Sequence, residues 1–163
     1  RRKIMAMHTW FECKIRYEKV MENGMQKKVT EPYLVDALSF TEAEARIIEE
    51  MTPFISGEFT VSDIKRANYS ELFPSDEESA DRWFKCKLIF ITLDEKSGAE
   101  KKTSTQVLVQ AADLRDAVKK LDEGMKGTMA DYQIGMVSET PLMDVYPYSA
   151  EPNDKPEFDP SKA

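Results

Sequence analysis

An internal repeat constrains the fold of this chain more than any other feature. Residues 10–14 read Trp-Phe-Glu-Cys-Lys, and residues 83–87 read Trp-Phe-Lys-Cys-Lys. Four of the five positions match, and two of the matches are the rare types Trp and Cys. The correspondence continues through Leu34-Val35 with Leu108-Val109 and closes at Phe73-Pro74 with Tyr146-Pro147. A repeat of this length predicts two units with the same order of elements.

The start of each copy predicts a β-hairpin. In the first copy, apolar Phe11, Cys13 and Ile15 alternate with charged residues, which is the two-residue period of a strand with one buried face. The turn signals 22–24 (Glu-Asn-Gly) and 96–98 (Lys-Ser-Gly) follow at corresponding places. A second strand then ends near residue 37 in one copy and residue 111 in the other. Pro32 removes a ladder donor, so we expect an edge or an interruption there.

A helix and a third strand are expected to follow each hairpin. Ser39 with Glu42 fits a capping box, and Asp113 with Asp116 is a weaker version of it. The apolar stripes that we expect the helices to bury are Phe40, Ala43, Ile47, Met51 and Phe54 in the first copy, and Leu114, Ala117, Val118, Leu121 and Met125 in the second. Third strands are expected near 59–64 and 132–137, each followed by a short extended piece that could be a fourth strand.

The predicted fold class is α+β, with two tandem β-β-α-β(β) repeats. We bound the first repeat at 7–74, an acidic linker at 75–82, the second repeat at 83–148, and a disordered, acidic and Pro-rich tail at 149–163. Because about 65 residues are marginal for an independent core, we expect both repeats to pack as one pseudo-symmetric body with antiparallel sheet. Residues 1–6 match nothing in the second copy; whether they are native is left open, and Met7 is a candidate start.

The scarce residue types argue against an enzyme. The chain has one histidine, His8, and two cysteines, so it lacks the usual zinc sets and catalytic triads. Its six glycines form no phosphate-binding loop. We therefore predict no catalytic residue, no cofactor and no metal, and we expect Cys13 and Cys86 to be buried thiols in a reducing, cytoplasmic environment. No apolar run is long enough to span a membrane.

The residues most able to carry function lie on the polar faces of the two first strands. This candidate binding face consists of Trp10, Lys14, Arg16, Trp83, Lys85 and Lys87. The indoles could stack bases while the lysines hold phosphates. Alternatively, each Trp packs against the other repeat, the linker or the tail, which is the more common role of a duplicated aromatic position.

Two classes of function follow. The leading hypothesis is a non-enzymatic protein-binding or assembly module, with a protein partner or self-association, because Ile89, Ile91 and Leu93 make one outer face apolar. The alternative is single-stranded nucleic-acid binding through the Trp/Lys sheet face. The net charge of −7, from 23 basic and 30 acidic residues, weakens this alternative without removing it, since a local basic patch can coexist with an acidic protein.

Two segments carry a resemblance to a known family. The opening 7–14 (Met-His-Thr-Trp-Phe-Glu-Cys-Lys) and the segment 33–46, from Tyr33 to Arg46, resemble an uncharacterised domain-of-unknown-function family common in Bacteroidetes and their phages or mobile elements. The resemblance extends from Met7 to Tyr148. It implies a bacterial or phage origin and a cytoplasmic location, and it brings no named catalytic residues with it.

Overall fold

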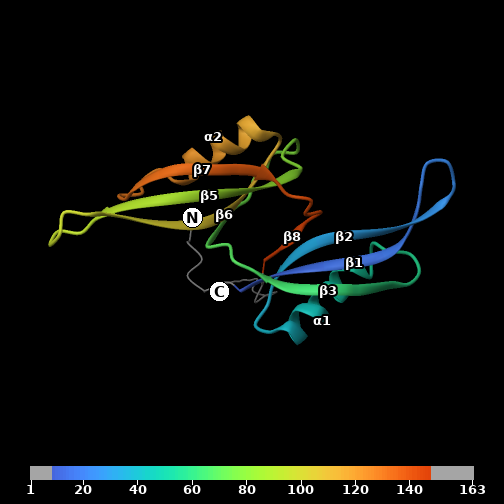
Figure 1. Ribbon diagram of the computed structural model, residues 1–163. Helices are drawn as coiled ribbons and strands as arrows, with labels where there is room; N and C mark the ends of the chain where they lie inside the picture. Colours follow the sequence, from blue (N-terminus) through green and yellow to red (C-terminus); the bar gives the residue numbers. More distant parts are fainter. Residues whose placement is uncertain (1–8, 148–163) are drawn as a thin grey trace, which may run out of the picture. The chain divides into compact units, whose positions relative to one another are not determined.

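The computed structural model describes residues 9–147, which form two units (Figure 1). The first unit takes the chain up to Ala67 and again from Asp144, and the second takes Asn68–Met143. The described residues contain two helices and two four-stranded sheets, so the predicted α+β class is correct. The expectations for residues 1–6, Met7, His8 and the tail at 149–163 lie outside the described residues.

The first unit is a sheet with one helix. Strands β1 (Trp10–Val20) and β2 (Gln26–Asp36) form an antiparallel hairpin, and β3 (Phe59–Ala67) pairs antiparallel on the other side of β1. The helix α1 (Phe40–Met51) connects β2 to β3. Pro32 lies within the continuous strand β2, opposite Lys14 of β1. The pairing of β2 with β8 (Val145–Tyr146) involves Leu34 and Val35, so it begins two residues after Pro32. The strand is therefore uninterrupted, and no strand among residues 9–147 pairs with β2 on the outer side of Pro32.

The second unit has the same order of elements. Strands β5 (Arg82–Leu93) and β6 (Glu100–Ala111) form the hairpin, α2 (Leu114–Gly124) follows, and β7 (Asp131–Glu139) pairs antiparallel with β5. The short strand β4 (Glu71–Phe73) lies at the other border of this sheet. The sheet orders are β3-β1-β2-β8 and β4-β6-β5-β7, so the second order, read backwards, corresponds strand for strand to the first.

Each sheet is completed by a strand that the sequence repeat assigns to the other copy. Strand β4 follows β3 in the chain but pairs with β6, and β8 follows β7 but pairs with β2. Both pairings are parallel, so the expectation of antiparallel sheet is correct for three strands of each sheet and wrong for the fourth. Neither β4 nor β8 is joined to its partner by a hairpin, which is the connection that favours antiparallel pairing. The structural units thus divide the chain at 67/68 and 143/144, whereas the sequence predicted repeat boundaries at 74/75 and 82/83.

Both helices begin with the same capping arrangement. The Ser39 hydroxyl accepts a hydrogen bond from the Glu42 N–H at 3.1 Å, while the Glu42 carboxylate accepts one from the N–H of Leu38. At α2, Asp113 accepts from the Asp116 N–H at 2.8 Å, and Asp116 accepts from the Ala112 N–H at 2.9 Å. The predicted caps are confirmed, and each satisfies one N–H of the first helical turn and one N–H just before the cap residue.

Each helix packs on one face of its own sheet. In the first unit this core is formed by Phe11, Cys13, Ile15, Val35, Ala37, Ala43, Ile47 and Met51. In the second it is formed by Phe84, Cys86, Leu88, Val107, Val109, Ala111, Ala117, Leu121 and Met125. The predicted stripes are wrong at three residues: Phe40 and Leu114 are about half exposed, and Phe54 is 77% exposed. Phe40 and Leu114 are the first helical residues, and Phe54 lies beyond the end of α1, where the helical period no longer orients a side chain.

A basic residue of each helix contacts the segment that follows the short parallel strand of the same sheet, β4 or β8. Lys120 of α2 contacts Glu77 and Asp116 at 2.9 Å each and donates to the Ser75 hydroxyl at 3.1 Å. Arg46 of α1 donates to the carbonyl of Pro147 at 3.2 Å. The two positions are 74 residues apart, the same offset that relates the second strands of the repeats. The segment expected as an acidic linker is therefore fixed to α2 at its start.

Candidate functional site

The six residues of the candidate binding face fall into two separate groups. Trp10, Lys14 and Arg16 lie on β1 in the first unit, and Trp83, Lys85 and Lys87 lie on β5 in the second. Within each strand they alternate with the core residues, so they share the sheet face that α1 or α2 does not cover. The alternation in the sequence therefore predicted correctly on which strand and on which side of the sheet each of the six residues lies.

Both indoles on these faces are covered. Trp10 is 2% exposed and Trp83 is 5% exposed, whereas Lys14, Lys85 and Lys87 are partly exposed and Arg16 is exposed. Stacking of a base requires an accessible aromatic face. In this arrangement the basic side chains, and not the indoles, are the part of the face that a ligand can reach.

A buried carboxylate, which the sequence reasoning did not single out, lies beside Trp10. Asp36 of β2 pairs with Trp10 in the register of the hairpin and is 6% exposed. Its carboxylate accepts a hydrogen bond from the Thr9 N–H at 3.2 Å. No local pattern distinguishes this acidic residue from the exposed ones of the chain, because its burial depends on the cross-strand register.

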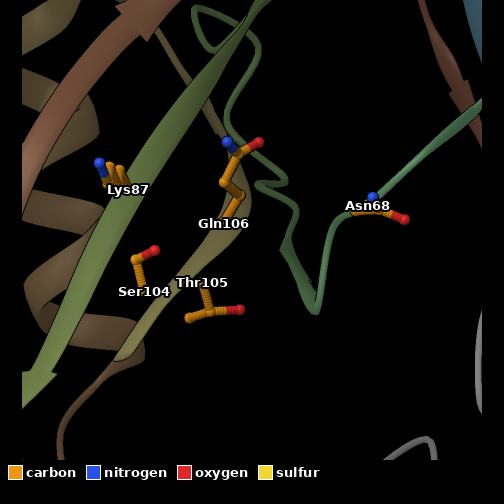
Figure 2. Close-up of a pocket in the computed structure, with 5 residues that line it drawn as sticks. All are labelled: Asn68, Lys87, Ser104, Thr105 and Gln106. Carbon is orange, nitrogen blue, oxygen red and sulfur yellow. The ribbon is translucent and has the colours of Figure 1, made fainter. Parts of the chain in front are cut away.

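The second unit has a polar hollow on its sheet. Figure 2 shows Lys87 on β5 and Ser104, Thr105 and Gln106 on β6, with Asn68 on the neighbouring segment. The hollow has a volume of about 350 Å³. Lys87 and Gln106 are directly opposite each other in the strand register. The lining offers one ammonium group, two hydroxyls and two amides, which suit a small polar or anionic ligand.

The segment before β4 forms one wall of the hollow. Ser70 donates its N–H to the Gln106 carbonyl at 2.8 Å, and its hydroxyl accepts from the Thr105 hydroxyl at 2.9 Å. Of the lining residues, sequence reasoning identified only Lys87. The uncharged polar run from Thr103 to Gln106 was the available sequence signal for the other residues on β6. It lines a hollow only because β6 pairs with β5 and contacts the segment around Ser70. None of the five lining residues is a carboxylate, imidazole or thiol that could act as a general base or nucleophile at neutral pH.

The two cysteines are unpaired and buried, as predicted. Burial raises the pKa of the Cys13 thiol to about 12, with the charges of Glu12 and Asp63 adding to the effect. Burial also raises the pKa of Cys86 to about 11. Both thiols are therefore protonated at neutral pH, and a protonated thiol is a poor nucleophile and metal ligand.

A tyrosine cluster of the first unit shares one carboxylate. Tyr17 donates its phenolic proton to Glu31 at 2.9 Å and Tyr33 donates to the same oxygen at 3.4 Å, while Lys19 lies 3.6 Å from the other oxygen. Burial, and then the hydrogen bond to Glu31, raise the pKa of Tyr17 to about 12. Sequence reasoning did not identify this shared acceptor, because Glu31 lies in β2 next to Pro32 and no local pattern distinguishes it from the other acidic residues.

Metal-ligand clusters and membrane-spanning helices are both absent from the described residues. Within residues 9–147, no group of three or more His, Cys, Asp or Glu side chains could hold a metal ion. Over the same residues, no helix has the length and apolar character needed to cross a membrane.

Comparison with known proteins gives one match. The family model described as "Domain of unknown function (DUF4494)" matches residues 9–148. No curated protein sequence and no solved structure matches the chain.

Proposed function

We propose that this chain, which belongs to the DUF4494 family of domains of unknown function, is a non-enzymatic protein-binding or assembly module. The observation that carries the proposal is the exposure of large apolar side chains on regular elements. On β7, Ile134 is 36% exposed and Met136 is 42% exposed. Apolar side chains held on an ordered strand are typical of surfaces that a partner covers.

The hairpin of the first unit offers a second exposed group. Val20, Met21 and Met25 lie at the tip that joins β1 to β2, and all three are exposed. The corresponding tip between β5 and β6 has a different character, because residues 94–98 read Asp-Glu-Lys-Ser-Gly. Methionine side chains adapt to irregular partner surfaces, which favours a binding role for the first tip.

Site-specific photo-crosslinking tests this proposal. A photoreactive residue is placed at Met21 or Met136 of the full chain, with Lys96 in the polar tip as the matched control position. We expect discrete protein adducts from position 21 or 136 in cells, and none from position 96. Equal labelling from all three positions, or no adduct from any, would contradict a protein-binding role.

Single-stranded nucleic-acid binding is the alternative, and Lys87 in the polar hollow is the observation that favours it. The test is a titration of the Trp fluorescence with short single-stranded DNA and RNA at two salt concentrations. Because the indoles are covered, we expect little change in emission. Saturable quenching that weakens as salt rises would favour the alternative, since counterion release makes such binding salt-sensitive.

We also propose that the two repeats arose by duplication and that they behave as one pseudo-symmetric body. The matched strand orders, the matched caps and the matched helix cations support the duplication. The pairing of β8 with β2 supports the single body, because the first unit is completed by a strand that follows the whole second unit in the chain. A bacterial or phage origin and a cytoplasmic location complete the proposal, which the sequence resemblance and the two free thiols support.

A further inference from the structure

Strand β7 has an open edge. It ends the sheet order β4-β6-β5-β7 and pairs only with β5 among the described strands. Figure 1 shows β7 in orange at the border of its sheet. The strand is nine residues long, so its outer side presents a row of backbone N–H and C=O groups that no neighbouring strand satisfies.

The chemistry of this edge favours pairing. Residues 132–138 read Tyr-Gln-Ile-Gly-Met-Val-Ser, seven positions without a charge or a proline. Tyr, Ile and Val are strong strand formers, and the exposed Ile134 and Met136 add apolar surface. Edge strands that remain unpaired usually carry charges or proline at such positions.

The corresponding edge of the first unit is protected. Strand β3 ends the order β3-β1-β2-β8, but its second half carries Asp63, Lys65 and Arg66, and all three are exposed. Both edge strands have a register irregularity, opposite Lys14/Ile15 in β3 and opposite Lys87/Leu88 in β7. The difference between the two edges therefore lies in their charge.

We propose that β7 pairs antiparallel with the β7 of a second copy of this chain, an inference that rests on the proposed protein-binding function. Two identical strands meet about a twofold axis, so one edge supplies both halves of the contact. In the register centred on Gly135, residues 132–138 of the two copies place only uncharged residues opposite one another, and Ile134 of each copy lies opposite Met136 of the other. The other border of the sheet consists of β4 and the charged start of β6, Glu100 to Lys102, so growth stops at the dimer.

The charge of the protein gives this dimer a distinctive salt dependence. Each copy has a net charge of −7, and Asp131 and Glu139 flank the uncharged stretch. Two such copies repel each other at low ionic strength, and salt screens the repulsion. Dimerisation is therefore expected to strengthen as salt rises, which is the opposite of the dependence expected for nucleic-acid binding.

Sedimentation velocity of the full chain tests the inference. We expect a monomer–dimer equilibrium that shifts to the dimer at higher protein and salt concentration. Met136→Lys, which places two like charges at the contact, is expected to weaken dimerisation about tenfold or more. Thr60→Lys, at an exposed position of the β3 edge, is the matched control and is expected to leave the equilibrium unchanged.

Hydrogen exchange of the wild-type protein provides a second measurement that does not depend on a variant folding correctly. Amides of residues 132–138 are expected to gain protection as the protein concentration rises, while those of β3 do not. A wild-type protein that is monomeric at all concentrations would overturn the inference. So would a dimer that persists in Met136→Lys and shows no added protection of the β7 amides in the wild type. If the chain is monomeric but position 136 gives protein adducts, the dimer is wrong and the protein-binding function stands with a different partner. If there is neither a dimer nor an adduct from any position, both the dimer and the protein-binding function are wrong.

Discussion

At the scale of single residues, each unit buries one free cysteine in its core. Cys13 and Cys86 occupy matching places on β1 and β5, each buried beneath its own helix. Their sulfur atoms lie 4.0 Å and 3.9 Å from the carbonyl oxygens of Phe11 and Phe84, two residues earlier in the same strands. Repetition of an inert thiol in this setting indicates a packing role, because a small buried side chain is what the space between strand and helix requires.

Thiol reactivity gives the first prediction. Because burial raises the pKa of Cys13 to about 12 and that of Cys86 to about 11, both are expected to react very slowly with a disulfide reagent at neutral pH in the folded protein. Both react at once in denaturant. Fast modification of either thiol in the native state would show that its strand opens readily.

The phenol of Tyr17 gives a prediction for alkaline pH. Its pKa is raised from 10.0 to about 12 in the folded protein, so between these values the unfolded chain binds fewer protons than the folded one. The free energy of unfolding must then fall as pH rises from 10 towards 12. Urea unfolding in this range should show a shallower decline for Tyr17→Phe than for the wild type. Identical slopes would mean that Tyr17 titrates alike in both states.

At the scale of elements, local signals determine where the helices begin. Replacing Ser39 or Asp113 by Ala removes the acceptor for an N–H of the first turn, and each change is expected to lower the free energy of unfolding by about 1 kcal/mol. Glu44→Ala, an exposed change within α1, is the control and should alter stability by less than half as much. Urea unfolding measures all three variants. An equal loss for the control would show that the lost stability does not come from the cap.

The anchoring of β4 is a second prediction at this scale. Lys120→Met removes the ammonium that contacts Glu77, Asp116 and Ser75, while Lys119→Met changes an exposed neighbour in the same helix. Hydrogen exchange of the amides of residues 71–77 is expected to be faster in Lys120→Met and unchanged in Lys119→Met. If both variants exchange like the wild type, the pairing of β4 with β6 holds the segment without the cation.

The success of sequence reasoning differs between these features for a physical reason. The hairpins, helix starts and core stripes depend on residues two to four positions apart, so alternation, turn residues and Ser39 with Glu42 were sufficient to find them. The partners of β4 and β8 lie far along the chain, and neither Leu72 nor Val145 carries a local sign of its partner. The same limit applies to the candidate site, where Lys87 was found by its strand pattern but Asn68 and Ser104 join it only through strand register.

At the scale of the whole molecule, the exchanged strands predict coupled unfolding. If the second unit unfolds, the segment before β8 is no longer held in place, which weakens the pairing of β8 with β2. If the first unit unfolds, the segment between β3 and β4 is no longer held at its start. Trp10 reports on one unit and Trp83 on the other, so the variants Trp83→Phe and Trp10→Phe isolate each signal. We expect coincident urea transitions within each variant when fluorescence and far-UV circular dichroism are compared. Two separated transitions would show that the units unfold independently.

The exchange of strands also has a consequence during synthesis. The ribosome delivers the chain from its N-terminus, so β1, β2, α1 and β3 emerge first. Their sheet nevertheless stays incomplete until β8 (Val145–Tyr146) has been synthesised, almost at the end of the described chain. The second sheet, by contrast, has all four of its strands once Glu139 has emerged. The half of the protein that is translated first is therefore the last to be complete.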